Sequence, residues 1–177
     1  ENITVLTSSP WDSINPENHW VDSNLNELAA GPSRASIQVV ATIVSIAADS
    51  GPISRCTTCR RVLRDENCVE HGIQEGTPDT RVRLVLDNGD VALTALLNGP
   101  VAEEALKGSR DAIKAEIKNM GKDAWLSKKR EEWFGRRVRI RGRTRIDEGG
   151  GYLLVDEMSL DNVEPLTADQ LRERWKL

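Results

Sequence analysis

The chain has three cysteines, and all of them lie close to one histidine in the pattern Cys56-Thr-Thr-Cys59, eight residues, Cys68-Val-Glu-His71. Thiolate sulfur and imidazole nitrogen are the ligands that Zn²⁺ prefers, and four of them complete a closed tetrahedral site. Two residues between the ligands of each pair allow one tight turn to direct both side chains at a single point. The pattern therefore predicts a metal-bound hairpin in which Cys56, Cys59, Cys68 and His71 hold one structural Zn²⁺.

Other interpretations of the cysteines fit the pattern less well. A redox-active CxxC pair usually opens a helix in a βαβ unit, and it leaves the third cysteine and the histidine unexplained. A disulfide framework favours an even number of cysteines in a secreted protein. A catalytic zinc keeps one coordination position open, which four protein ligands would fill. Because His19 is the one remaining histidine, we expect a binding protein rather than an enzyme.

Length and hydropathy limit the class of protein further. At 177 residues the chain suits one domain with insertions or an appendage. No apolar run reaches the roughly 18 residues that a membrane-spanning helix needs, so we expect no membrane partner. Cysteines that stay reduced as metal ligands are typical of an intracellular protein.

Charge is distributed unevenly along the chain. The net charge is −4, which by itself argues against a nucleic-acid partner. The segment from Lys128 to Arg145, however, holds nine basic and two acidic residues and carries +7. Local patches rather than net charge attract polyanions, although a solvated face would show the same run. The predicted metal hairpin adds four more arginines, Arg55, Arg60, Arg61 and Arg64.

Five segments have the composition or alternation of β-strands, namely residues 36–46, 81–86, 91–97, 136–146 and 152–160. The second and third are joined by Asp87-Asn-Gly-Asp90, which contains the Asn-Gly dipeptide that two-residue hairpin turns favour. Alternation in the second segment predicts that its apolar side chains face the core and that Arg81 and Arg83 face outward.

The fourth of these strands carries a ladder of arginines. Every odd position from 137 to 145 is arginine, and the even positions are Val138, Ile140, Gly142, Thr144 and Ile146. Successive side chains of a strand point to opposite faces, so one face would be apolar and the other a line of guanidinium groups. That line could contact a polyanion or pair with the acidic ends of the chain.

Helical patterns lie between the third and fourth strands. A Gly-Pro dipeptide is placed to start one helix, and Ser109 can cap a second helix that Gly121 ends. A third helical stretch follows, and we expect its aromatic residues, Trp125, Trp133 and Phe134, to pack against the strands.

The end of the chain forms a further helical pattern. Thr167-Ala-Asp-Gln170 resembles a capping box, and Leu171 and Trp175 share one face four residues apart. A helix of about ten residues is marginal alone. We therefore expect this helix to pack on the chain's own strands or on another subunit.

The order of elements predicts the fold. Five strands with a helical element between the third and fourth have the order of an OB-fold barrel. We therefore expect a mainly β fold with a helical insert, namely a five-stranded OB-fold barrel with a zinc ribbon between strands 1 and 2. The expected parts are an N-terminal extension or linker (1–35), the OB-fold (36–166, with the ribbon at 53–75) and a C-terminal assembly helix (167–177).

The local sequence also resembles a known family. Cys-x-x-Cys-Arg-Arg-Val-Leu, which begins at Cys56, is followed by Cys-x-x-His-Gly72 and by Gly99-Pro-x-Ala-Glu-Glu-Ala-Leu-x-Gly108. In this order of elements, residues 20–177 resemble the C-terminal OB domain of the large subunit of replication protein A, in its archaeal form in particular. The resemblance implies a zinc ribbon between the first two barrel strands, sequence-tolerant binding of single-stranded DNA, and a last helix that joins partner subunits.

Binding of single strands combines cationic side chains for the backbone with aromatic rings for base stacking. The third strand, 91–97, lacks the aromatics that members of this family often carry there. Tyr152, beside the loop between strands four and five, is the best stacking candidate. The residues expected to contact nucleic acid are Arg55, Arg60, Arg61, Arg64, Arg81, Arg83, Arg143, Arg145 and Tyr152.

Two alternatives stay open. The chain could be mainly a trimerisation hub with weak DNA affinity, assembled through Leu171 and Trp175. It could also be an RNA-binding OB domain, because the sequence does not separate preference for RNA from preference for DNA. The expected partners are single-stranded DNA and the other subunits of replication protein A.

Overall fold

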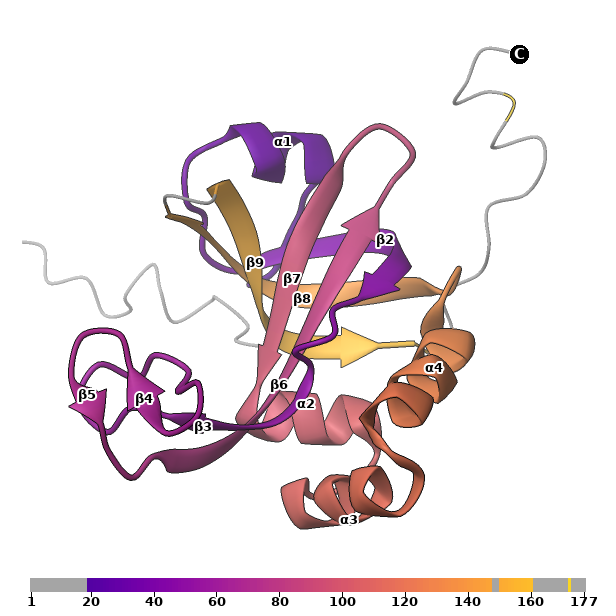
Figure 1. The fold of residues 1–177 in the computed structure, drawn as a ribbon. Helices are drawn as coiled ribbons and strands as arrows, with labels where there is room; N and C mark the ends of the chain where they lie inside the picture. Colours follow the sequence, from indigo (N-terminus) through magenta and orange to yellow (C-terminus); the bar gives the residue numbers. More distant parts are fainter. Residues whose placement is uncertain (1–18, 148–149, 161–171, 173–177) are drawn as a thin grey trace, which may run out of the picture.

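The structure is a computed structural model that describes residues 19–147, 150–160 and 172. Strands dominate it, and a block of helices lies at one end (Figure 1). The elements are β1 (Val21–Asp22), α1 (Leu25–Ala30), β2 (Ile37–Ile46), β3 (Gly51–Arg55), β4 (Asn67–Cys68), β5 (Gly72–Ile73), β6 (Thr77–Asp87), β7 (Ala92–Asn98), α2 (Gly99–Leu106), α3 (Arg110–Met120), α4 (Lys122–Trp133), β8 (Arg137–Asp147) and β9 (Gly150–Ser159).

Five long strands form the body of the molecule. β2 pairs antiparallel with both β6 and β8. β6 pairs antiparallel with β7, β8 pairs antiparallel with β9, and β7 pairs with β9 in parallel. The pairings therefore run in a ring, β2–β6–β7–β9–β8 and back to β2, which we call the barrel. The mainly β architecture expected from the sequence is confirmed.

Alternation along the strands separates the core from the outer face. The inward side chains of β6, Val82, Leu84 and Leu86, are at most 1% exposed, whereas Arg83 lies on the surface. On β8, Val138 and Ile140 are buried between exposed or half-buried arginines. The apolar face and the arginine face that the sequence predicts are thus both present.

The helices between β7 and β8 pack on one end of the barrel, at the bottom and right of Figure 1. Ser109 caps α3 by accepting a hydrogen bond from the Ala112 amide, as its position predicts. On α4, Trp125 and Trp133 are buried, as expected. Phe134 is 67% exposed, so its expected place in the core is wrong. It follows Trp133 by about 100° around the helix axis, away from the buried side.

Part of the predicted N-terminal extension packs on the barrel. β1 pairs in parallel with β2, and Leu25 and Leu28 of α1 are 1% exposed within the main core. Asn24 caps this helix by accepting a hydrogen bond from the Asn26 amide. The division at 35 and 166 stays a prediction, and the C-terminal pair Leu171 and Trp175 lies outside the described residues.

The loop between β6 and β7 differs from the expected two-residue turn. The last pair across this hairpin is Asp87–Ala92, so four residues connect the strands. The Asn88 side-chain oxygen accepts hydrogen bonds from the amides of Asp90 and Val91. Its side-chain nitrogen donates to Asn24 and Asn26 of the α1 region. These tertiary contacts favour the wider loop over the compact turn that Asn-Gly alone would form.

A two-stranded stem carries the metal hairpin away from the barrel. β3 pairs antiparallel with the first half of β6, from Thr77 to Arg81, and the short β4–β5 hairpin lies beyond it, at the lower left of Figure 1. The sequence predicts a turn here rather than β3, because Ser50-Gly-Pro52 is a turn-like string and proline is tolerated only at strand edges. Within the described residues no helix is long and apolar enough to span a bilayer.

Candidate metal centre and nucleic-acid interface

The four predicted metal ligands lie together, and two of them come from the end of β4 (Cys68) and from the turn between β4 and β5 (His71). Their ligand atoms all lie within 4.8 Å of one another. Cys59 Sγ is 3.5 Å from Cys68 Sγ, and His71 Nδ1 is 3.6 Å from both Cys56 Sγ and Cys68 Sγ. Zinc–sulfur bonds of about 2.3 Å in a tetrahedron place ligands about 3.8 Å apart. The donor set therefore fits a closed tetrahedral metal site, and the expected grouping is confirmed.

Backbone turns and one glutamine hold this cluster, which we call the ribbon site. The Cys59 amide donates to Cys56 Sγ, and Arg60 adopts a left-handed conformation (φ 63°) that closes the first turn. Gln74 Nε2 donates to Cys56 Sγ at 3.0 Å, while its oxygen accepts a hydrogen bond from the Thr57 hydroxyl. Sequence reasoning missed Gln74, because no ligand motif extends three residues past the histidine.

The surroundings of the ribbon site shift the pKa values of its three thiols in different directions. Burial raises the pKa of Cys56, but the amides of Cys59 and Thr58 outweigh burial and lower this pKa to about 6. Burial likewise raises the pKa of Cys68, while the Glu70 amide and the His71 ring lower it below its usual value. The Arg61 amide lowers the pKa of Cys59, but burial and the neighbouring thiols raise it to about 11. Because thiolates are the metal ligands, binding of a cation displaces the proton that Cys59 holds.

A basic groove is lined by the turn after β2, by β3 and β6, by ribbon residues 61–64 and by the start of α4. It has a volume of about 620 Å³, and Val62, Val69 and Ile53 supply apolar lining. Its basic side chains are Arg61, Arg64, Arg81, Arg83 and Lys122. The carboxylate among its lining residues is Asp49. We call this feature the ribbon groove.

The ribbon groove is held by ion pairs and burial. Asp49 contacts Arg81 at 2.5 Å and Arg83 at 3.1 Å. Arg61 pairs with Glu70 at 2.8 Å. Burial lowers the pKa of Lys122, whose ammonium group donates to the Ser50 carbonyl and lies 4.9 Å from the Trp125 ring.

Strand register builds a second surface on the outer side of the barrel. Across β6, β7, β9 and β8, one cross-strand line is Arg83–Leu96–Leu154–Arg143. The adjacent line is Val85–Thr94–Tyr152–Arg145. We call these eight residues the sheet face. Its middle consists of Leu96 and Leu154 in the first line and of Thr94 and Tyr152 in the second, and it has arginine at both edges of the first line and at one edge of the second.

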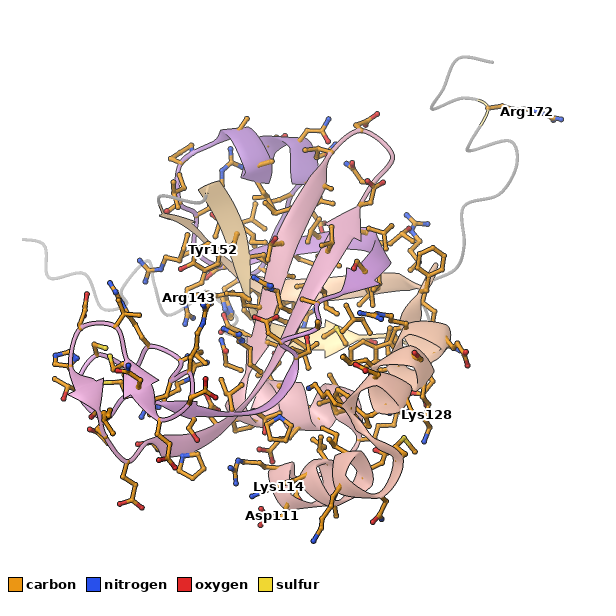
Figure 2. The ribbon with its side chains drawn as sticks, in the orientation of Figure 1. Asp111, Lys114, Lys128, Arg143, Tyr152 and Arg172 are labelled. Carbon is orange, nitrogen blue, oxygen red and sulfur yellow. The ribbon has the colours of Figure 1, made fainter. Side chains whose placement is uncertain are left out.

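Seven of the nine predicted nucleic-acid residues divide between these two surfaces. Arg81, Arg61 and Arg64 line the ribbon groove, Arg83 belongs to both, and Arg143, Arg145 and Tyr152 lie on the sheet face. Figure 2 shows Arg143 and Tyr152 on the same side of the barrel, the side on which the ribbon projects. The Arg143 guanidinium donates to both carboxylate oxygens of Asp156.

Two of the predicted arginines lie apart from both surfaces. Arg55 pairs with Asp79 and donates to Asn98 at 2.6 Å and to the Arg60 carbonyl, so its guanidinium ties the stem to β7. Arg60 is exposed in the turn of the ribbon site. For both residues, contact with nucleic acid stays a prediction.

Several residues of the two surfaces were missed by sequence reasoning. Leu96 and Leu154 are half-buried on the outer face, where the register between β7 and β9 brings them together. Lys122 and Asp49 reach the ribbon groove from α4 and from the turn after β2. The alternation of β7 and β9 indicated which side chains face outward, but long-range pairing decides which of them meet.

Comparison with known proteins shows similarity at the level of the fold. No protein-family model matches the chain, and no curated protein sequence matches it. The chain is similar to a chain of a replication protein A heterotrimer bound to single-stranded DNA, with a TM-score of 0.51 and 11% identity. That alignment covers 89% of this chain and 38% of the other, so this chain spans well under half of the larger protein's length.

Two further solved structures are more weakly similar. The second OB-fold domain of replication protein A from Methanococcus maripaludis aligns with a TM-score of 0.45 and 13% identity over 82% of this chain and 100% of that domain. The SSB domain of a Synechococcus protein aligns with a TM-score of 0.34 and 16% identity over 72% of this chain and 92% of that one. At 11% identity, the similarity to the heterotrimer chain shows a shared fold alone.

Proposed function

We propose that the chain binds single-stranded DNA with little sequence preference, as an OB-fold module of a replication protein A-like assembly. The observation that carries this proposal is the sheet face, in which Arg83 and Arg143 flank the apolar pair Leu96 and Leu154. A nucleic-acid strand offers matching chemistry, because it carries charged phosphates along one side and apolar base faces along the other.

The chemistry of the proposed binding follows from the side chains. Guanidinium groups hold phosphate oxygens in bidentate fashion and release condensed counterions, so affinity falls with salt. Tyr152, between Thr94 and Arg145, offers a ring on which one base can stack. Leu96 and Leu154 present apolar surface that tolerates any base. The described sheet face thus favours contact with backbone and base faces over the reading of base edges.

The proposed metal is one structural Zn²⁺ in the ribbon site. Cys56, Cys59, Cys68 and His71 would hold it, and a filled four-ligand set leaves no position for a reacting water. Zinc binding in small modules supplies on the order of 10 kcal/mol of folding free energy. The role proposed for the metal is therefore to fix the hairpin that forms one wall of the ribbon groove. A non-enzymatic, intracellular protein is part of the same proposal.

The fold similarity supports the replication protein A-like assignment, because the aligned chain belongs to a heterotrimer that is bound to single-stranded DNA. The DNA binding and the assembly of that protein come to this chain only as proposals, at 11% identity. The zinc ribbon motif and the order of elements in the sequence point in the same direction.

A titration of fluorescent oligo-dT tests the proposed function. The wild-type chain is expected to bind at about 50 mM salt with an affinity in or above the non-specific range of roughly 10⁻⁴–10⁻⁶ M, and to weaken steeply at about 200 mM. The double variant Arg83→Ala/Arg143→Ala is expected to bind at least about 10-fold more weakly. Arg136→Ala, which removes one exposed arginine on the helical side of the barrel, is the control for the single variants Arg83→Ala and Arg143→Ala, each of which should weaken binding more than it does. Wild-type binding weaker than about 10⁻⁴ M would refute the proposal.

Assembly with partner subunits is the second candidate function. The exposed Phe134 ring borders an apolar pocket of about 410 Å³ formed with Ile43 and Ile46 of β2. Deletion of residues 167–177, followed by mass measurement with partner subunits, tests the proposed assembly helix. Unchanged assembly would contradict it.

Preference for DNA over RNA is tested by competition between oligo-dT and oligo-U of equal length. The proposed DNA-binding module is expected to favour oligo-dT, because its proposed contacts go to phosphates and base faces and none of them goes to a ribose 2′-hydroxyl. Stronger competition by oligo-U would favour the RNA-binding alternative.

A further inference from the structure

Asp49 makes an unusual contact for a residue in a groove that is otherwise basic. It lies in the turn between β2 and β3, and its Oδ2 accepts a hydrogen bond from Arg81 Nη2 at 2.5 Å. Its Oδ1 lies 3.1 Å from Arg83 Nη2. One carboxylate therefore bridges two guanidinium groups, as two oxygens of one phosphate group would.

The backbone on both sides of Asp49 is anchored independently of its carboxylate. The Ala47 amide donates to the Arg83 carbonyl at 2.8 Å, and the Arg83 amide donates to the Ser50 hydroxyl at 3.0 Å. The Asp49 side chain itself is 43% exposed. Its carboxylate can therefore rotate into solvent while the turn stays in place, and its pair with Arg83, in which both side chains are nearly half exposed, is held weakly.

The charge of the ribbon groove depends on where that carboxylate lies. With Asp49 in contact, the pair of arginines and the carboxylate carry a net charge of +1, and with Asp49 withdrawn the pair presents +2. The Asp49 charge also acts on Lys122, whose pKa it raises against the effect of burial. A phosphate group that enters the groove thus meets a like charge at the point where the arginines converge.

We propose that Asp49 is an internal competitor that occupies a phosphate position of the ribbon groove, and that a bound strand displaces it. This inference rests on the proposed function, since Arg83 belongs both to the sheet face and to the ribbon groove that Asp49 regulates. Asp49 shields Arg81 and Arg83 from free anions and keeps their guanidinium groups aligned in the unbound chain. It also holds the affinity for a nucleic-acid strand below the value that the arginines alone would give.

The variant Asp49→Asn separates the two effects, because asparagine keeps the shape and removes the charge. The variant is expected to bind oligo-dT about 3- to 10-fold more tightly than wild type at about 50 mM salt. The slope of log K against log salt is expected to steepen by up to about 0.7, the value of one more single-strand phosphate contact. In the Arg83→Ala background the gain from Asp49→Asn is expected to be smaller, because Asp49 then shields Arg81 alone.

Glu131→Gln provides the matched control, with the same change of net charge. Glu131 is exposed on α4, about 14 Å along the helix from Lys122. Equal gains from Asp49→Asn and Glu131→Gln would mean that only net charge matters, and would overturn the inference. Weaker binding by Asp49→Asn would overturn it too, because Asp49 would then act only by aligning the arginines. Absence of oligo-dT binding by wild type and variant alike would overturn the proposed function, and the inference with it.

Discussion

At the scale of single residues, Gln74 shows how the ribbon site depends on more than its ligands. Its side-chain nitrogen donates to Cys56 Sγ, and its oxygen accepts from Thr57, so it orients the thiolate. Loss of a hydrogen bond to a metal ligand typically lowers metal affinity 10- to 100-fold. We expect Gln74→Ala to lower zinc affinity by about this factor in a competition with a chromogenic chelator. Glu75→Ala, an exposed neighbour, serves as control, and equal affinities of the two variants would contradict the role of Gln74.

Gly142 on β8 lies so close to β9 that it has no room for a side chain. A Cβ atom at this position would lie 2.0 Å from the backbone oxygen of Leu154, on the neighbouring strand β9. Because backbone cannot move aside as a flexible side chain can, we expect Gly142→Ala to lower the free energy of unfolding by about 1–3 kcal/mol. Urea denaturation measures the change. Gly108→Ala, where the nearest atom is at 3.7 Å, should have a much smaller effect, and similar losses in both variants would contradict the argument.

Single residues also show what a sequence can predict. Which face of a strand a side chain occupies follows from its position in the strand. Alternation alone therefore indicated the outward arginines on β6 and β8 and the buried Val82 and Ile140. Phe134 escaped this reasoning because it lies where α4 ends and the chain turns at Gly135. Asp49 contacts Arg81 across 32 residues of chain, and no local pattern indicates such a contact.

At the scale of elements, the ribbon and the barrel have separate cores. The core of the ribbon consists of Cys56, Cys68 and Leu63, with Cys59 packed against it, and the main core belongs to the barrel and its helices. Without a metal, this small cluster has Leu63 as its one large apolar side chain, so it buries too little apolar surface to hold the ribbon together. We therefore expect a zinc chelator to unfold the ribbon and leave the barrel folded.

Hydrogen exchange with and without chelator measures this expected local unfolding. The Leu63 amide, which donates to the Ser54 carbonyl, should lose protection when the metal is removed. The Ala47 amide, which donates to the Arg83 carbonyl in the barrel, should keep it. Simultaneous loss of protection at both amides would show that ribbon and barrel unfold as one unit.

Elements with strong local patterns could be predicted, and those that depend on a partner could not. Residues 36–46 and 136–146 overlap β2 and β8 almost completely, because β-branched runs and strict alternation are local features. β1 has two residues, too few to show alternation, and it is a strand because it pairs with β2. β3 begins with Gly51-Pro52 and is a strand because the first half of β6 extends beyond the barrel to pair with it.

At the scale of the whole molecule, two surfaces that come from distant parts of the sequence meet at Arg83. The ribbon groove is built from the segment before β6 and from α4, whereas the sheet face depends on β7, β8 and β9. Arginines from before and after the helices α2 to α4 thereby border one path on a protein whose net charge is −4. Local concentration of cations explains how an acidic chain can attract a polyanion.

The measurement that tests this account most directly is a map of amide chemical-shift changes on addition of oligo-dT to the zinc-loaded chain. We predict the largest changes along the sheet face, at Leu96, Leu154 and Tyr152, with further changes in the ribbon groove around Arg83. Little change is expected at Phe134, which borders the apolar pocket beside β2 and belongs to neither of the two surfaces. Changes centred on Phe134 and absent from the sheet face would contradict the account.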